Sequence, residues 1–594
     1  MDQKRIFMAL AISAVILIAF QFIQAEFLPH PPPPAVVASQ SQPDATSTPA
    51  AAAANAPGAS GTAGTGANAS AVAAANGPRL SIDTPNIEGS LALTGAVLDD
   101  VQLKAYHETT AKNSPLVQIL GRRDSKTPFY TQFGWTNPAG SNIAVPTDST
   151  VWTASANTLT PDAPVTLSWD NGAGVIFQQV LSVDDKFMFS VTQNVINHTN
   201  APIKLYDWGR VARDYLPDEQ KSYILYDGPL GVINGTLKQI SYASTKSDGT
   251  HSPDGTAYSE TSNGGWLGIT DKYWLTALIP TQDSNLNGAV RYLPTTLGDG
   301  HAYQTDFISN APATIAPGAT SSDQMHLFTG AKVVKTLDAY QAQYNIPSFD
   351  HAVDFGHLYL ITKPIFFCLD WLNSQIGNFG LAIMVFTVGV KALFFPLASY
   401  SYRSMGKMKA AAPKIKALKE MYKDDNTKIQ QETMALYKAE KINPASGCLP
   451  MLVQIPVFFA LYKVIYITIE MRQAPFYGWI HDLSAPDPTN IFNLFGLIPF
   501  DPTVISPYLG LGALPIIMGF TMFLQQKLNP APPDPVQARM FQFMPIIFTF
   551  MLARFPAGLV LYWTWNNLLS VGQQWLIMRR AAGPKTTKTV LAKT

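Results

Sequence analysis

The spacing of apolar residues changes along this chain, and each change marks a new kind of element. From residue 79 to about residue 345, apolar and polar residues alternate in short stretches, which is typical of half-buried β-strands. Residues 186–199 are the clearest case, with Phe189 and Val191 on one side and Ser190 on the other. Turns rich in Asp, Asn and Gly separate such stretches, so residues 79–345 are predicted to form a large all-β antiparallel sandwich.

Residues 266–280 predict two further strands around a turn at Asp271 and Lys272. Lectins and glycosidases also use β-sandwiches. However, no two carboxylates in this region can be placed in one site from the sequence. We therefore expect a structural or partner-binding domain.

After residue 355 the alternation ends and helical patterns begin. Residues 355–377 carry apolar residues three and four positions apart, which predicts an amphipathic helix in a membrane interface. A helix packed against the preceding domain is the alternative. Residues 378–580 then predict an all-α core of five transmembrane helices, since a spanning helix needs about 20 apolar residues. The five apolar segments are 379–400, 448–469, 508–528, 540–555 and 556–578.

One more apolar segment, residues 6–23, follows Lys4 and Arg5. A cleaved signal peptide has a similar pattern, but this run is long and no clear small-x-small cleavage site follows it. We expect residues 1–24 to be an N-terminal transmembrane anchor. Residues 25–78 are rich in Pro, Ala and Gly and are predicted to be a linker.

Charge predicts the orientation of these segments. The 594 residues carry no net charge, yet residues 24–356 hold 29 acidic and 17 basic residues. Residues 401–447 hold ten basic and five acidic residues, and the tail over 581–594 is basic. Because loops rich in Lys and Arg stay in the cytoplasm, we expect both termini there and the β domain outside the cytoplasmic membrane.

The basic segment 401–447 is predicted to be a cytoplasmic helical hairpin. Pro413 is expected to start its first helix, and Thr427 with Gln430 forms a capping-box pattern for the second. The basic face either meets anionic lipid or docks an acidic RNA or a targeting partner. The candidate docking residues are Arg403, Lys407, Lys414, Lys416 and Lys438.

Lys391 lies within the apolar segment 379–400. A lysine at the centre of a spanning helix costs roughly 2.5–3.5 kcal/mol on insertion scales. Such a residue either carries its ammonium toward the headgroups or faces a polar cavity. We favour a wet groove inside the membrane as the working site.

Other polar and aromatic residues in the predicted spans extend this candidate groove. Asn566 and Gln573 are seven positions apart, as are Asn567 and Gln574, so each pair shares one helical face. Hydrogen bonds between helices explain buried amides equally well, and ordinary packing explains single aromatic residues. The candidate groove residues are Lys391, Thr387, Gln454, Tyr462, Tyr562, Trp563, Asn566 and Asn567.

Motifs for cofactors, metals and catalysis are not apparent in the sequence. It contains no P-loop, no GxGxxG and no HExxH pattern, and its two cysteines are too few for a disulfide framework. We therefore expect no cofactor, no metal and no enzymatic activity.

At this point the residues resemble a known family, the Oxa/YidC membrane protein insertases, over essentially the whole chain. The resemblance is carried by PKIK at 413–416, QQETMALYKAEKINP at 430–444, GCLPMLVQIPVFFALY at 447–462, RQAPFYGWIHDLS at 472–484 and FPAGLVLY at 555–562. At the aligned position of the intramembrane positive charge, bacterial members usually have arginine and this chain has Lys391. Trp563 stands where a second tyrosine often follows Tyr562, and the segment 488–507 is longer than in the best-known members.

This resemblance implies a periplasmic β-supersandwich and a hydrophilic groove open to the cytoplasm and to lipid. It implies an insertase and chaperone for inner-membrane proteins of Gram-negative bacteria, acting alone or with the Sec translocon. The implied partners are nascent membrane proteins, the lipid bilayer, the ribosome, the Sec translocon and the signal recognition system. A polytopic solute transporter or channel is the main alternative, although no inverted repeat is visible. A periplasmic binding module tethered by its spans is another.

Overall fold

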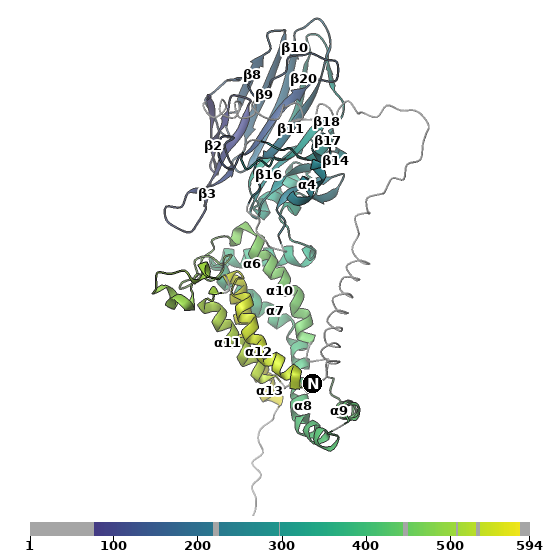
Figure 1. Cartoon of the computed structure of the whole chain (residues 1–594), viewed down its shortest axis with the longest axis vertical. Coiled ribbons are helices and arrows are strands. Elements are labelled where there is room, and N and C mark those ends of the chain that lie inside the picture. The colour runs from purple at the N-terminus through teal and green to yellow at the C-terminus, as the bar shows by residue number, and fades with distance from the viewer. Residues whose placement is uncertain are drawn as a thin grey trace, which may run out of the picture. The chain divides into compact units, whose positions relative to one another are not determined.

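The fold is known from a computed structural model, in which a β domain is followed by a helical part (Figure 1). The structure describes residues 77–217, 225–295, 298–423, 425–443, 449–506, 509–529 and 535–581. The predicted anchor at 1–24, nearly all of the linker at 25–78 and the tail at 582–594 lie outside the described residues.

The β domain consists of two sheets, as the alternating pattern predicts. The strand order of the larger sheet is β14-β17-β18-β11-β5-β3-β2-β1-β7, with β19 beside β11 and β4 beside β3. Its strands are β1 (Arg79–Asp83), β2 (Ile87–Ala92), β3 (Val97–His107), β4 (Leu116–Leu120), β5 (Phe129–Thr136), β7 (Thr158–Leu159), β11 (Ile203–Arg213), β14 (Thr256–Asn263), β17 (Asn285–Tyr292), β18 (Tyr303–Ser309) and β19 (Ala313–Ile315).

The second sheet has the order β13-β12-β15-β16-β20-β10-β9-β8-β6. Its strands are β6 (Thr153–Ala154), β8 (Val165–Asp170), β9 (Val175–Val183), β10 (Met188–Asn197), β12 (Gly228–Ile233), β13 (Thr236–Gln239), β15 (Trp266–Thr270), β16 (Trp274–Pro280) and β20 (Thr320–Ala331). Two helices accompany the sheets, α4 (Tyr242–Thr250) and α5 (Val334–Gln343). Among the strands that the structure describes, every pair is antiparallel except β1 with β7.

The predicted strand at 186–199 is confirmed as β10, which lies between β9 and β20 (Figure 1). Phe189, Val191 and Val195 are buried, whereas Ser190 and the other alternate residues are half-buried. Strands β15 and β16 confirm the predicted pair at 266–280. The period of two therefore identified the core-facing residues correctly.

Two carboxylates lie together in the β domain, although the sequence placed none in one site. The side chain of Asp323 on β20 lies close to that of Asp207 on β11, so their carboxyl groups interact. Burial and, after it, the negative charge of Asp207 together raise the pKa of Asp323 to about 7. The two strands are far apart in the chain and belong to different sheets, so sequence spacing does not reveal this pair.

The helical part begins with the short 3-10 helix η1 (Phe349–Ala352). It continues with α6 (Tyr359–Ile376), α7 (Phe379–Leu393), α8 (Phe395–Met421), α9 (Asn426–Ala439), α10 (Leu449–Ile467), α11 (Ala513–Leu528), α12 (Pro535–Leu552) and α13 (Ala557–Ala581). Among the described residues, the connection from α10 to α11 includes the short 3-10 helices η3 (Ile469–Met471), η4 (Ile491–Gly496) and η5 (Pro502–Val504). Helix α6 buries Thr362, Ile365, Phe366 and Leu369 on one face and exposes Leu360 and Trp371.

The predicted single helix over 379–400 is broken. Helix α7 ends at Leu393, and α8 starts at Phe395 after a bend of 68°. Pro396 explains the break, because its ring has no N–H to donate and clashes with the carbonyl four residues earlier. Among the described helices, none by itself combines the length and apolarity of a membrane span, and the bent pair of α7 and α8 meets both requirements together.

The hairpin predicted at 401–447 also differs in detail from its prediction. Pro413 lies inside α8 and does not start a helix. The side chain of Asp425 caps α9 by accepting a hydrogen bond from the Lys428 backbone N–H at 2.9 Å, in place of the predicted Thr427 cap. An aspartate before a helix competes well with threonine as a cap. Buried contacts between Ala411, Ile415 and Tyr437 hold α8 and α9 together.

Candidate functional site

Helix α7 brings Thr387 and Lys391 to the site. The helix starts cleanly because the side chain of Asn378 accepts a hydrogen bond from the Leu381 N–H at 3.0 Å. Thr387 is buried, and its hydroxyl donates to the Ile383 carbonyl at 2.6 Å. Lys391 follows one turn later, in the last turn before the bend.

Lys391 is held by α13. Its Nζ donates to Ser570 Oγ at 2.8 Å, and Ser570 Oγ in turn donates to the Asn566 carbonyl at 2.7 Å. Among the described residues, no carboxylate lies within ion-pair distance of this ammonium. The lysine charge is therefore oriented by a neutral hydroxyl and stays available to an incoming anion.

A second polar contact links α10 to α13. Gln454 on α10 donates from Nε2 to the Tyr562 hydroxyl at 3.0 Å. Tyr562 is fully buried at the first turns of α13, so this hydroxyl meets its hydrogen-bond requirement through the Gln454 amide.

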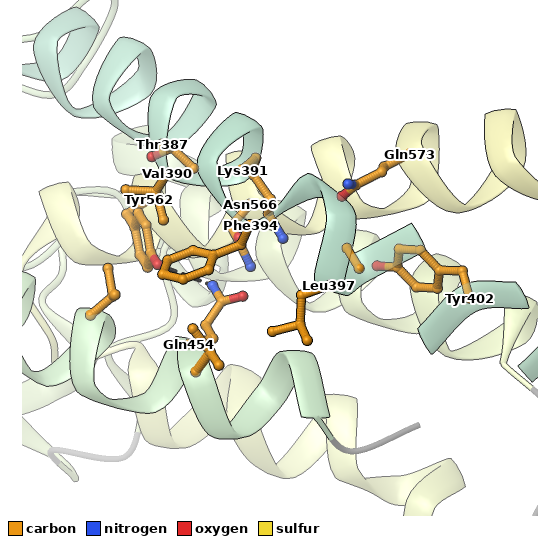
Figure 2. Close-up of a pocket in the computed structure, with 13 residues that line it drawn as sticks. Thr387, Val390, Lys391, Phe394, Leu397, Tyr402, Gln454, Tyr562, Asn566 and Gln573 are labelled. Atoms are coloured by element: carbon orange, nitrogen blue, oxygen red, sulfur yellow. Dashed lines mark hydrogen bonds between the residues drawn. The ribbon is translucent and has the colours of Figure 1, made fainter. Parts of the chain in front are cut away.

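These side chains line one partly open cavity of about 40 Å³. Figure 2 shows Lys391, Gln454, Tyr562 and Asn566 directed into the same space, with Gln573 and Tyr402 further along it. The full lining is Thr387, Val390, Lys391, Phe394, Leu397, Ala398, Tyr402, Val453, Gln454, Val457, Tyr562, Asn566 and Gln573. The cavity thus combines an apolar wall with one cation and several amide groups.

Two amides in this lining have unused hydrogen-bonding capacity. Asn566 Oδ1 and both amide atoms of Gln573 are buried and have no partner among the described residues. Because a buried amide without a partner costs free energy, these atoms are suited to bind a polar guest that supplies both donors and acceptors.

Five of the eight candidate groove residues line this cavity, and three do not. Tyr462 packs against Phe555, with ring centroids 5.1 Å apart. Trp563 packs edge-on against Phe458 at 4.8 Å. Asn567 donates from Nδ2 to Thr521 Oγ1 on α11 at 3.2 Å, and is buried in that helix contact.

The predicted face-sharing on α13 is confirmed. Asn566 and Gln573 both line the cavity. Asn567 and Gln574 both turn to α11 and its end, where Gln574 Nε2 donates to the Leu528 carbonyl at 3.2 Å. Sequence reasoning missed Ser570, although it lies one turn after Asn566 on the cavity side of α13 and its position was readable from that spacing.

The candidate docking residues Arg403, Lys407, Lys414, Lys416 and Lys438 are all exposed on α8 and α9. Lys414 pairs with Glu440 at 2.5 Å, and exposed pairs of this kind contribute little stability. Among the described residues, no group of three or more His, Cys, Asp or Glu side chains is arranged to hold a metal ion.

The fold and the cavity together define a class of protein in which a large two-sheet domain is joined to a part built of apolar helices around a cavity with one cation. Residues 371–585 match the model of the 60Kd inner membrane protein family, and residues 79–368 match that of the YidC periplasmic domain. The chain belongs to the YidC family.

Relatives align along the full chain. It is 57% identical over 601 residues to the membrane protein insertase YidC of Acidiphilium cryptum, covering 100% of both chains. It is 56% identical over 585 residues to the protein of the same name from Granulibacter bethesdensis, covering 98% of this chain and 99% of the relative. A crystal structure of an active YidC insertase, 17% identical, covers 84% of this chain and 94% of that chain with a TM-score of 0.35.

Proposed function

We propose that this chain inserts membrane proteins into the bacterial inner membrane and helps them fold, without enzymatic chemistry. The observation that carries the proposal is the full-length similarity to relatives named membrane protein insertases, at 57% identity over 100% of both chains. Client membrane proteins and the lipid bilayer are therefore its partners.

The proposed working part is a core of five membrane spans, built by α7 with the start of α8 and by α10, α11, α12 and α13. The β domain lies in the periplasm, and both termini lie in the cytoplasm. Contacts within the chain support this orientation. Glu470 Oε1, just after α10, accepts a hydrogen bond from the Val334 N–H of the β-domain helix α5 at 3.1 Å. Arg472 Nη2 donates to the His107 carbonyl of β3 at 2.6 Å. The α10–α11 connection therefore belongs to the periplasmic side.

The cavity at Lys391 is the proposed groove for the polar segment of a client. A polar segment crosses hydrocarbon only at high cost, and a polar cavity part-way through the membrane lowers that cost. Lys391 attracts acidic client residues, because charge attraction is stronger where water is sparse. The membrane potential adds about 2.3 kcal/mol per charge per 100 mV and favours outward movement of acidic groups.

The free amide atoms give the groove a second way to hold a client. Each peptide group of an extended chain carries one N–H donor and one carbonyl acceptor. Gln573 offers both an acceptor and donors, and Asn566 offers an acceptor. Such contacts are independent of client sequence, as an insertase with many clients requires. The apolar client helix then leaves along α10 and α13 into lipid.

The exposed basic residues of α8 and α9 are the proposed docking face for the ribosome, the signal recognition system or the Sec translocon. Arg403, Lys407, Lys416 and Lys438 are exposed and suit an acidic RNA surface. Charge reversal at these four positions should abolish ribosome binding in a sedimentation assay while the core stays folded.

A photocrosslinking experiment tests the groove directly. A photoreactive residue at Val390 or Leu397, both in the cavity lining, should crosslink a ribosome-stalled membrane protein. Val388 provides the matched control, since it lies on the same helix as Val390 but is exposed on another face. Equal crosslinking at Val388 and Val390 would contradict the groove. Normal client insertion together with lost solute uptake in a Lys391→Ala strain would instead favour a transporter.

A further inference from the structure

The segment between α10 and α11 contains an apolar loop that does not line the groove. Residues 491–505 expose several large apolar side chains, with Leu497 83% and Val504 80% exposed. The other prominent ones are Phe492, Leu494, Phe495 and Ile505. Exposed apolar groups at this density mark a binding surface. In Figure 1 the loop is the yellow-green segment that projects from the helices beside α11.

We propose that this loop, residues 491–505, is a second membrane anchor that inserts into the outer leaflet beside α11. Its ligand is the acyl-chain and headgroup boundary of the lipid on the periplasmic side. The inference rests on the membrane location of the family and is independent of insertase activity.

The backbone of the loop is prepared for an apolar environment. Asn490 Oδ1 accepts from the Phe492 N–H at 2.9 Å, and Asn493 Oδ1 accepts from the Gly496 N–H at 2.9 Å. Asn493 Nδ2 also donates to the Phe500 carbonyl at 3.1 Å. Lipid tolerates polypeptide only where the backbone polar groups are satisfied within the protein. The Asn490 and Asn493 side chains therefore satisfy three backbone polar groups of the loop within the protein.

The loop is fastened at its base to the start of α11. Asn490 Nδ2 donates to the Leu509 carbonyl at 2.8 Å, and the Ile491 N–H donates to the Leu511 carbonyl at 2.9 Å. Asp487 Oδ2 accepts from the Leu514 N–H at 2.7 Å. The loop is therefore attached to the start of α11, a helix on which Phe520 is also exposed. An α11 that faces lipid carries the loop to the membrane surface.

The backbone geometry also favours outward display of apolar side chains. Leu494 and Phe495 adopt left-handed conformations, with φ of 52° and 59°, which bulky residues rarely adopt. Strain of this kind persists where it serves a function. Both side chains are exposed, so this strained turn presents apolar groups at the surface of the protein.

Charge limits the depth and selects the ligand. Between residues 488 and 506 the only charged residue is Asp501, whose carboxylate accepts from the Thr503 N–H and hydroxyl at 2.9 and 2.7 Å. No Lys or Arg lies between Arg472 and Lys527, so attraction to anionic headgroups contributes nothing. Burial of apolar area drives the binding, and Asp501 keeps its part of the loop at headgroup level.

Depth-dependent fluorescence quenching tests this anchor in the full chain. Single cysteines at Leu497 and Val504 are labelled with an environment-sensitive dye, after Cys368 and Cys448 are replaced by Ser. The protein is placed in nanodiscs of phosphatidylethanolamine and phosphatidylglycerol, where both faces are accessible. Phe520→Cys on α11 serves as the lipid-facing control, and Ser247→Cys on exposed α4 as the aqueous control.

Nitroxide-labelled lipid should quench Leu497 and Val504 labels as strongly as the Phe520 label. Iodide should quench them about five-fold less than the Ser247 label, because the dye lies at the boundary between headgroups and acyl chains. Iodide quenching equal to that at Ser247 would overturn the anchor. Protection from both quenchers would also overturn it, since protein and not lipid would then cover the loop. The probes report location whether or not clients insert, so failure here is distinct from failure of the insertase proposal.

Discussion

The charge of Lys391 and its hydrogen bond to Ser570 make separate contributions that two substitutions distinguish. Lys391→Met removes the ammonium and keeps most of the side-chain length. Ser570→Ala removes only the hydroxyl that orients the ammonium at 2.8 Å. If Lys391 captures acidic client segments, the first substitution should impair insertion far more than the second.

The magnitude follows from the geometry. A client carboxylate about 4 Å from the ammonium gains roughly 4 kcal/mol at an effective dielectric constant of 20, as a gross upper value. Desolvation of both groups offsets much of this attraction. A remainder of about 1.4 kcal/mol corresponds to a ten-fold change in rate. We therefore expect Lys391→Met to slow insertion of an acidic client about ten-fold, and Ser570→Ala to slow it only about two-fold because the charge remains.

Protease protection of a client in proteoliposomes measures the rate. The client is prepared with an acidic translocated segment and, as the comparison, with the same segment neutralised. Lys391→Met should slow only the acidic form. Lys463→Met is the matched control on α10, because that lysine is already paired with Asp354 at 2.7 Å. Equal losses for both client forms, or equal losses for Lys391→Met and Ser570→Ala, would refute capture by the charge.

Three further predictions concern stability. Arg213 is buried and forms two hydrogen bonds to Asp271 at 2.7 and 2.6 Å; Arg213→Met should destabilise the β domain by about 3 kcal/mol in urea unfolding, because it strands a carboxylate. The pKa of Asp323 is about 7, against an ordinary 3.8. The contribution of this group to stability is therefore fully present below about pH 4 and is lost as the pH rises through 7. Asp323→Asn should flatten the pH dependence of thermal unfolding between these values. A Cβ on Gly519 of α11 would overlap Thr549 Oγ1 of α12; Gly519→Ala should cost about 1–3 kcal/mol in detergent melts, and Thr549→Ala should restore most of it.

Each of these has an outcome that would contradict it. Unchanged urea unfolding of Arg213→Met would mean that the attraction between Arg213 and Asp271 only offsets the cost of desolvating the two groups. If the pH dependence of thermal unfolding is unchanged in Asp323→Asn, another group causes it. Failure of Thr549→Ala to rescue Gly519→Ala would mean that the two helices are not limited by this contact.

Helix α13 shows how much of the site could be predicted from the sequence. Spacing alone put Asn566 and Gln573 on one face and Asn567 and Gln574 on another, since helical periodicity is a local property. It did not tell which face meets the cavity. Asn567 was therefore assigned to the groove together with Asn566, whereas the packing of α13 against α11 turns it to Thr521.

The break after α7 could have been predicted from the sequence. Pro396 stands in the printed sequence, and its effect on a helix is local chemistry. The apolar run through it outweighed it in the prediction of one continuous span. The cap of α9 was misjudged in a similar way, because Asp425 and Thr427 are both good caps and the sequence does not rank them.

By itself the sequence determined the β-sandwich class, strands such as β10, the helical part and the family, because periodicity, turn chemistry and long motifs are carried by neighbouring residues. Only the tertiary structure decided that Asp207 lies beside Asp323, that Ser570 holds Lys391, and that Asn490 reaches Leu509. These contacts join residues distant in the chain. They depend on how whole elements pack, and no local pattern encodes that packing.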